Sequence, residues 1–453
     1  MGGSPEPQPL GLIASLYSTT SRYVAKFNQF CVQDFLARGI SKGSLTFVHP
    51  DHTEILFGQS ATEAAAAARP VARVVVHDPP CFYSRVAAAA DIGFAEAFML
   101  KYFAVDNSDA LTDVFRVLIL NRDNAKLSAS SLLPSRMGAS LNTFLHTLKR
   151  NTLSGSQRNI EAHYDLSNQL FATFLGHTWT YSCAFFDPRA PAASVTLDTA
   201  QHAKIDKVID KACITSDSHV LDIGCGWGEL AIRAVQRTGC RVTGITLSRE
   251  QLALANKRAH AAGVADRITF ELVDYRVVAA RGIHFDRIVS VEMIEAVGHE
   301  FLGTFFAAIQ NLLAPQGLLV MQAITTPEER YEEYRTTTDF IQKYIFPGGI
   351  CPSFEALVTA MAKNSKLCVE GVENIGPHYA TTLKEWRRRF LASEKNGDVA
   401  AAGFDDVFVR KWVYYFCYCE AGFATRTLGV LQVVFSKSRN TATLGGPPVL
   451  AVC

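Results

Sequence analysis

The sequence predicts an α/β protein in which a doubly wound, Rossmann-like sheet follows a smaller α+β domain. From about Glu161 onward, short apolar stretches of strand length alternate with amphipathic stretches of helix length. One apolar stretch runs directly into a glycine-rich loop, GCGWG at 224–228, and that loop leads into a helical stretch. Strand–helix alternation at this spacing is typical of a parallel sheet whose helices form the crossovers.

The first 160 residues have a different pattern. Residues 1–20 are expected to be a flexible tail. Residues 21–123 are expected to form the small domain, with a helix that ends at Gly39, strand-like runs at 44–49, 54–58 and 72–78, and an amphipathic stretch at 82–105. Residues 124–160 are rich in Ser, Asn, Lys and Arg, a composition typical of a linker.

The second domain, residues 161–453, carries the alternating pattern. Its expected strands are 219–224, 241–246, 268–274, 285–291 and 317–324, and its expected helices include 229–237, 248–263 and 301–314. In open sheets of this kind, ligands bind beyond the carboxyl ends of the strands, where the strand order reverses. The glycine-rich loop follows the first of these strands and therefore marks the expected site.

Composition excludes several classes of protein. The 44 basic and 43 acidic residues give a net charge of +1, whereas a general nucleic-acid binder carries a basic excess. The 11 cysteines are scattered, without zinc spacing, so no metal site is expected. With no signal-peptide pattern and no apolar run of spanning length, the sequence favours a cytoplasmic protein that is soluble or peripheral on a membrane.

The glycine-rich loop has the form D-x-G-x-G-x-G, from Asp222 to Gly228. Glycines let a backbone turn sharply and let a ligand lie against it, although a purely structural turn is the alternative. A dinucleotide fingerprint needs Gly or Ala where this chain has Glu229, and an acid about 20 residues later, which is absent. The loop therefore favours a nucleoside without pyrophosphate, and it resembles the S-adenosylmethionine loop of methyltransferases.

Thr246 and Gln251 follow the second strand, where many methyltransferases place an acid for the ribose hydroxyls. Ser248 and Gln251 also have the spacing of a helix capping box. From the residues alone, capping and ligand contact are equally good interpretations of Gln251.

Seven motifs in order carry a closer resemblance: HYDLSNQLF, YSCAFF, VLDIGCGWG, GITLSREQ, EMIEAVGHE, YIFPGG and the tail that begins YYFCYCEAGF. Over 161–437 the chain resembles the cyclopropane fatty-acyl-phospholipid synthases, which are related to the mycolic acid cyclopropane synthases. Residues 21–122 resemble the small N-terminal domain of the phospholipid-acting members, and 326–390 look most similar to plant-type synthases.

The resemblance implies a methyltransferase sheet and a lipid substrate. Such enzymes transfer the methyl of S-adenosylmethionine to a cis double bond of an unsaturated phospholipid acyl chain. Loss of a proton from the new methyl then closes a cyclopropane ring, and the family's base is a bound bicarbonate ion. An alkene is a weak nucleophile, so the site must align it with the sulfonium away from water.

The same motifs imply a bicarbonate cage made of Cys183, Glu295, Gln322, Ile324 and Tyr379. Glu292 is a second carboxylate one turn earlier, and the family's motif favours Glu295. Gln322 stands where bacterial synthases commonly have His, which favours a hydrogen-bonding role over proton transfer. Cys183 lies among aromatics without a neighbouring base, so it is expected to be a neutral thiol that lines the cage with its backbone.

The motifs also imply the residues that contact S-adenosylmethionine: Tyr181, Ser182, Gly224, Gly226, Thr246, Gln251, Tyr275 and Val291. Tyr275 lies in VDYR, where mycolate-type members have a Gly-Trp pair, so an aromatic beside adenine is preserved.

Three points about partners stay open on the sequence. The stretch LKEWRRRF at 383–390 combines basic and aromatic residues, which suits a membrane surface or, equally, a solvated helix face. A homodimer is an expectation without a motif of its own. The alternative functions are a lipid C-methyltransferase that gives a methyl-branched or methylene chain, an amine N-methyltransferase, and a non-catalytic lipid-binding protein.

Overall fold

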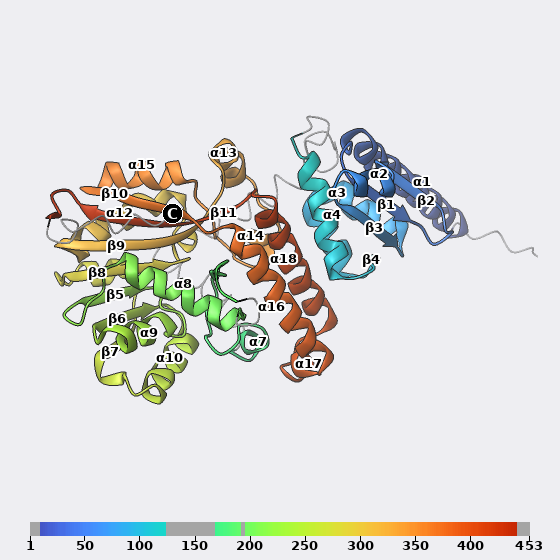
Figure 1. Ribbon diagram of the computed structural model, residues 1–453. Coiled ribbons are helices and arrows are strands. Elements are labelled where there is room, and N and C mark those ends of the chain that lie inside the picture. Colours follow the sequence, from blue (N-terminus) through green and yellow to red (C-terminus); the bar gives the residue numbers. More distant parts are fainter. Residues whose placement is uncertain (1–9, 124–167, 192–194, 442–453) are drawn as a thin grey trace, which may run out of the picture. The chain divides into compact units, whose positions relative to one another are not determined.

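The computed structural model describes residues 10–123, 168–191 and 195–441, with side chains from Tyr23 onward (Figure 1). The chain divides into two compact units. The first takes in the residues up to Asn142 together with Arg410–Tyr414, and the second takes in the rest. The expected linker, 124–160, lies outside the described residues.

The first unit is an α+β fold around a four-stranded sheet. The strands have the order β2-β1-β3-β4, in which β1 and β3 are parallel and the other pairs are antiparallel. Their bounds are β1 Ser44–Val48, β2 Glu54–Gly58, β3 Val71–Val76 and β4 Phe103–Val105. The helices are α1 Leu10–Gly39, α2 Ala61–Ala66, α3 Pro79–Met99 and α4 Ser108–Asn121.

This unit differs from the expectation at three places. Helix α1 begins at Leu10, within the stretch expected to be a tail. The amphipathic stretch at 82–105 divides into α3 and the short strand β4. Helix α4, which the sequence pattern did not indicate, is capped by Asn107, whose side chain accepts from the Ala110 N–H at 2.9 Å.

The second unit is built on a seven-stranded sheet with the order β10-β11-β9-β8-β5-β6-β7. The parallel core confirms the doubly wound prediction, and β11 alone among these strands runs antiparallel to both neighbours. The bounds are β5 His219–Ile223, β6 Arg241–Thr246, β7 Ile268–Leu272, β8 Phe285–Val291, β9 Leu313–Thr325, β10 Leu367–Asn374 and β11 Gly429–Lys437. Strand β5 has β6 on one side and β8 on the other, so the order reverses at its carboxyl end.

The helices of this unit are α7 Asn168–Ala172, α8 Leu197–Lys211, α9 Glu229–Thr238, α10 Arg249–Ala261, α11 Tyr275–Ala279, α12 Leu302–Leu312, α13 Glu328–Thr336, α14 Phe340–Tyr344, α15 Phe354–Asn364, α16 Pro377–Lys395, α17 Asp398–Ala401 and α18 Asp406–Ala424. Short 3-10 turns are η4 Ala265–Arg267, η5 Ile294–Ala296 and η6 His299–Phe301.

Helices lie on both sides of the sheet (Figure 1), and two apolar layers between helices and sheet fix this architecture. Successive residues of a strand point to opposite faces, so Leu221 and Ile223 belong to the core beneath α11, α12 and α15. Val220, the residue before Leu221, points to the opposite face and belongs to the core beneath α8, α9 and α10. The result is a three-layer α/β/α unit whose sheet is covered on both faces, as near-continuous apolar strands require.

The basic and aromatic stretch 383–390 does not form the exposed membrane face that the sequence allowed. Trp386 and Phe390 are fully buried within α16. Arg387 is also buried, and its guanidinium lies 3.0 Å from the Glu420 carboxylate. The side chains turn into the core because the aromatic residues and Arg387 share the inward face of the helix.

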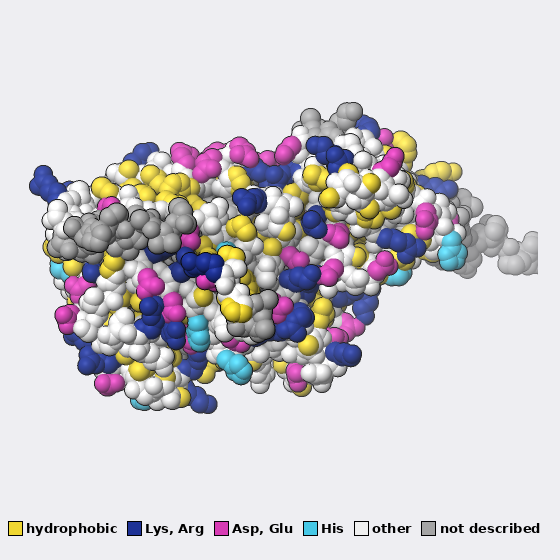
Figure 2. Space-filling view, viewed as in Figure 1, with side chains coloured by type: hydrophobic (Ala, Val, Ile, Leu, Met, Phe, Trp, Pro, Cys, Tyr) yellow, Lys and Arg dark blue, Asp and Glu magenta, His cyan; other side chains and the backbone are white. Residues whose placement is uncertain are grey.

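Among the described helices, none combines the length and apolarity needed to cross a bilayer. On the face of the protein that Figure 2 shows, basic and acidic side chains are interspersed, in keeping with the net charge of +1.

Candidate active site

The glycine-rich loop leaves β5 at the point where the strand order reverses. The N–H groups of Gly224 and Cys225 both donate to the Ile245 carbonyl at 3.0 Å, which ties the loop to the end of β6. Gly226 has φ +54°, and a Cβ there would meet no atom within 4 Å. The open space beside Gly226 belongs to the cavity described next, so the loop leaves room for a ligand to approach its backbone.

A cavity lies over this loop in the second unit. Its wall includes all eight residues expected to contact the cofactor: Tyr181, Ser182, Gly224, Gly226, Thr246, Gln251, Tyr275 and Val291. It also includes Asp222, whose Oδ2 is buried without a hydrogen-bond partner in the described structure. A buried polar atom of this kind indicates a place for a ligand's donor. Burial raises the pKa of Asp222 to about 7.

Gln251 takes part in the capping of α10 through its backbone N–H, and its side chain does something else. Ser248 caps α10 by accepting from the Gln251 backbone N–H at 3.2 Å. The Gln251 side chain does not complete a capping box; its Oε1 accepts from the Thr246 hydroxyl at 2.7 Å. Its amide group lines the cavity, so backbone capping and a cavity-facing side chain coexist in one residue.

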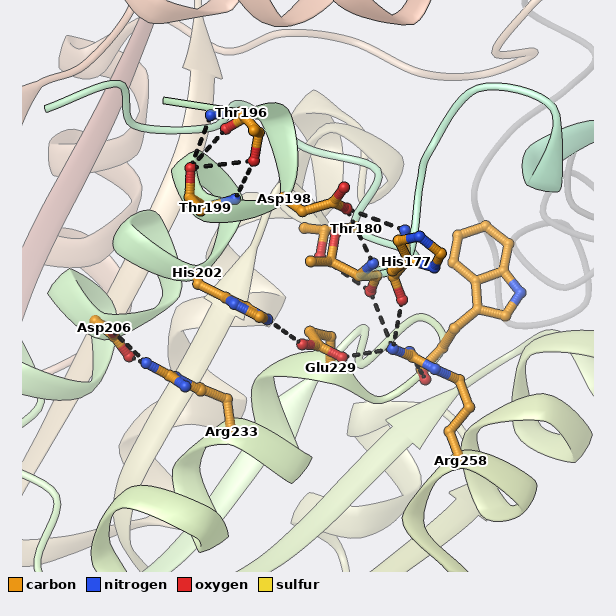
Figure 3. A network of polar contacts seen from close by, with 12 residues as sticks. His177, Thr180, Thr196, Asp198, Thr199, His202, Asp206, Glu229, Arg233 and Arg258 are labelled. Carbon is orange, nitrogen blue, oxygen red and sulfur yellow. Dashed lines mark hydrogen bonds and ion pairs between the residues drawn. The ribbon is translucent and has the colours of Figure 1, made fainter. Parts of the chain in front are cut away.

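An ion-pair network holds the segment before Cys183 against the loop (Figure 3). Glu229, the first residue of α9, accepts from His202 at 2.7 Å and from Arg258 at 2.5 Å. Arg258 also donates to the Trp227 carbonyl at 2.7 Å and to the His177 carbonyl at 3.2 Å. Glu229 therefore has a structural role: it holds Arg258, which links His177 to Trp227 of the glycine loop.

Glu292 lies at the centre of the residues expected to form the anion cage. Its carboxylate accepts three hydrogen bonds: from the Cys183 backbone N–H at 2.9 Å, from Gln322 Nε2 at 2.7 Å and from the Tyr379 hydroxyl at 2.8 Å. The sequence motif favoured Glu295 over Glu292, and the structure instead directs three of the five cage residues to Glu292. A carboxylate of the chain thus takes the donors that were expected to hold bicarbonate.

A chain of amides fixes the orientation of Gln322. Lys211 can only donate, and it donates to Gln432 Oε1 at 2.5 Å. Gln432 therefore presents its Nε2 to Gln322 Oε1, at 2.9 Å, and Gln322 presents its own Nε2 to Glu292. Lys211 also pairs with Glu373 at 2.5 Å, so its role toward Glu292 is to fix the orientation of the two amides on β11 and β9.

Glu295, on the 3-10 turn after β8, is hydrogen-bonded to Ile324, another of the residues expected in the cage. The Ile324 backbone N–H donates to Glu295 Oε1 at 2.5 Å, whereas Oε2 is buried without a partner in the described structure. Burial, with the nearby charge of Glu292, raises the pKa of Glu295 to about 8. At neutral pH Glu295 is thus protonated.

Cys183 contributes its backbone to this arrangement. Its thiol is fully buried and faces the Ala184 and Ile375 carbonyls, at 3.3 and 3.7 Å. Burial raises the pKa of this thiol well above its ordinary value, and Glu292 raises it further. A neutral thiol turned toward carbonyls is a poor nucleophile.

Sequence reasoning missed Lys204 and Asp222. Lys204 is buried on α8, lines the cavity and donates to the Ser182 hydroxyl at 2.6 Å. Burial lowers its pKa to about 8, against the opposing influence of Glu292. Asp222 belongs to the D-x-G-x-G-x-G form and could have been selected from it; Lys204 lies in an ordinary helical stretch that gives no signal.

The chain is similar to known proteins over most of its length. The family model for mycolic acid cyclopropane synthetase matches residues 151–433. The chain is 41% identical to tuberculostearic acid methyltransferase UfaA1 of Mycobacterium tuberculosis, over 82% of this chain and 84% of that protein. It is 31% identical to the cyclopropane-fatty-acyl-phospholipid synthase of Escherichia coli, over 79% of this chain and 86% of that protein.

Solved structures of cyclopropane synthases also match the chain. The cyclopropane synthase MmaA2 from Mycobacterium tuberculosis superposes with a TM-score of 0.56 at 30% identity, covering 62% of this chain and 98% of that one. The mycolic acid cyclopropane synthase CmaA1, complexed with SAH and CTAB, also has a TM-score of 0.56, at 31% identity, with coverage of 62% and 98%.

Proposed function

Since the chain belongs to the mycolic acid cyclopropane synthetase family and is an S-adenosylmethionine-dependent methyltransferase that acts on lipids, we propose that its acceptor is the cis double bond of an unsaturated phospholipid acyl chain. The proposed product carries a cyclopropane ring at that bond. Support for the phospholipid comes from similarity to the Escherichia coli synthase and from the small N-terminal domain.

The cavity fits S-adenosylmethionine, which when bound supplies an electrophilic methyl group. Asp222 offers an unpartnered Oδ2, Gly226 leaves open space for a close approach, and Tyr275 offers a ring. The glycine loop and the end of β6 would hold the nucleoside. The observation that carries the proposal is the position of Glu292: the same carboxylate lines this cavity and receives the donors of the predicted cage.

The surrounding aromatics suit an apolar acceptor. The Tyr379 ring is stacked on Phe423 with centroids 4.4 Å apart, and Tyr181 packs against Trp386 at 5.2 Å. Such walls exclude water and leave an alkene no competing nucleophile. Bicarbonate does not fit as the base, because three of its expected donors already bind the Glu292 carboxylate.

A methylene-branched acyl chain is the second candidate product, because the chain is 41% identical to tuberculostearic acid methyltransferase UfaA1. Methyl transfer to the double bond could be followed by proton loss that leaves a methylene branch in place of a ring. A saturated methyl branch would need an added hydride donor.

A membrane surface is the proposed place of encounter with the substrate. Tyr23, Phe27 and Phe30 project from one face of α1, at a spacing of four and three residues, and are 72%, 60% and 66% exposed. Aromatic side chains in such a row suit the interface of a bilayer.

The test is incubation of the protein with S-adenosylmethionine and vesicles of a monounsaturated phospholipid, followed by mass spectrometry of the acyl chains. The proposal expects chains heavier by one CH₂ that resist ozonolysis, as a cyclopropane does. Chains of the same mass that ozone cleaves would establish the methylene product. Unchanged chains, with methyl transfer to a small amine in parallel assays, would contradict a lipid acceptor.

A further inference from the structure

We propose that the Glu292 carboxylate is the general base of this enzyme, built into the chain at the place where the family resemblance implies a bicarbonate ion. This inference rests on the proposed function, because it names the group that removes the proton after methyl transfer. Three observations carry it: the hydrogen bonds to Glu292, its backbone conformation and the charges around it.

The hydrogen bonds to Glu292 are those of an anion site. A backbone N–H, an amide N–H and a phenol hydroxyl converge on its two oxygens, from Cys183, Gln322 and Tyr379. These donors come from three segments of the second unit that lie far apart in the sequence. They meet at one carboxylate that also faces the cofactor cavity.

The backbone at Glu292 is held in an unusual conformation. Its φ is +49°, in the left-handed region that non-glycine residues seldom adopt. The Glu292 N–H donates to the Gln322 carbonyl at 2.8 Å, which continues the β8–β9 pairing by one residue before the chain turns. The turn directs the side chain into the ring of donors.

The surroundings of Glu292 make its carboxyl more basic and also supply partners for its charged form. Burial raises the pKa of Glu292 above its ordinary value, whereas Lys204 and the three donors lower it. Lys211 and Gln432 hold the Gln322 amide so that its Nε2, the donor, faces the carboxylate. Glu295 remains neutral, and since Ile324 holds its Oε1, it is the weaker candidate for the base.

Glu292 acts after the methyl group has been transferred. The π pair of the acyl double bond forms the bond to the methyl carbon, and the pair of the sulfur–carbon bond stays on sulfur. The neighbouring acyl carbon then carries the positive charge. A Glu292 oxygen accepts one proton from the new methyl, and the released C–H pair forms the bond that closes the ring. If a hydride shift moves the charge to the methyl-bearing carbon, that pair forms the methylene double bond instead. Glu292 returns the proton to water when the product leaves.

The experiment compares the full-length wild type with Glu292→Gly and Glu292→Gln. Glycine suits the positive φ and opens a space of carboxylate size; glutamine keeps the space filled. In carbon-dioxide-free buffer, the wild type should turn over at its full rate, and added bicarbonate should not change it. Glu292→Gly should be slower by about 10²- to 10⁴-fold, the usual loss on removing a general base. Formate or bicarbonate should partly restore Glu292→Gly and should not restore Glu292→Gln.

A binding measurement supplies a second readout. In NMR titrations with ¹³C-bicarbonate, Glu292→Gly should bind the ion and the wild type should not. A wild type that slows without carbon dioxide and recovers with bicarbonate would overturn the proposal, as would bicarbonate binding to the wild type or a fast Glu292→Gly without added anion. If the wild type modifies no unsaturated phospholipid, the proposed function fails, and the ¹³C titration still decides whether Glu292 excludes the ion.

Discussion

Gly226 shows at the scale of one residue how the loop makes room for a cofactor. Its φ of +54° and the open space beside it mean that Gly226→Val would place a side chain in the cavity. We expect affinity for S-adenosylhomocysteine to fall by about 10- to 100-fold, the range for an overpacked site. Calorimetric titration measures this.

Gly263→Val is the matched control for this substitution. Gly263 has φ +70° and open space around it, and it lies outside the residues that line the cavity. It should suffer the same backbone strain and keep full affinity. Equal loss of affinity in both variants would attribute the effect to strain and contradict the loop assignment.

Glu295 gives a prediction about stability and pH. Its pKa in the folded protein, about 8, lies above its ordinary 4.5, so the folded state holds a proton that the unfolded state has lost between these values. The free energy of unfolding therefore falls as the pH rises through this window. In Glu295→Gln this fall should be shallower, as measured by denaturant unfolding at intervals across the window. Parallel curves for the two proteins would show that Glu295 is not protonated in the fold.

The residues of the site could be predicted unequally well. The eight cofactor residues belong to contiguous motifs, and all of them line the cavity. The sequence motif favoured Glu295, whereas the donors Cys183, Gln322 and Tyr379 meet Glu292 in the structure, because the two carboxyls are three residues apart and differ in which distant groups they reach. Cys183 and Tyr379 lie 109 and 87 residues from Glu292 in the sequence, so only the folded chain brings these donors to its carboxylate.

At the scale of elements, strands β11, β9 and β8 carry a chain of amides from Lys211 to Glu292. Gln432→Leu would leave Gln322 Oε1 without its donor and free the amide to turn. We expect kcat to fall about 10-fold, the effect of about 1–2 kcal/mol from a lost buried hydrogen bond, with unchanged affinity for S-adenosylhomocysteine.

The neighbouring substitution Leu431→Met serves as control. Leu431 packs against the apolar core on the other face of the sheet, and its replacement by Met nearly conserves the side-chain volume. A Gln432→Leu enzyme as fast as Leu431→Met would show that the amide chain does not position Gln322.

Some helices and strands could be predicted from the local sequence pattern, and others depend on pairing with distant segments. Strands β5 to β9 and helices α9, α10 and α12 lie close to the expected ranges, because each has its own apolar period. Strand β11 was not expected as an antiparallel member of the sheet. Its partners β9 and β10 are fixed by pairing across the fold; Gln432 and Gln322, for example, are 110 residues apart.

At the scale of the whole molecule, the exposed aromatic row on α1 bears on how the enzyme reaches its substrate. Replacing Tyr23, Phe27 and Phe30 together by Ser should weaken sedimentation with phospholipid vesicles, because it removes apolar surface that would enter the interface. Affinity for S-adenosylhomocysteine should stay the same, since the row belongs to the first unit and the cavity to the second. Unaltered vesicle binding would exclude α1 as the contact.

The central claim is that the methyl group is transferred to a lipid double bond and then loses one proton to a base in the active site. S-adenosylmethionine with a fully deuterated methyl group tests this directly, with monounsaturated phospholipid vesicles as acceptor and mass spectrometry of the modified acyl chain. The account predicts that the added carbon keeps two of its three deuterons, in a ring or in a methylene branch. An added carbon that keeps all three deuterons, or an acyl chain that gains no deuterium, would contradict it.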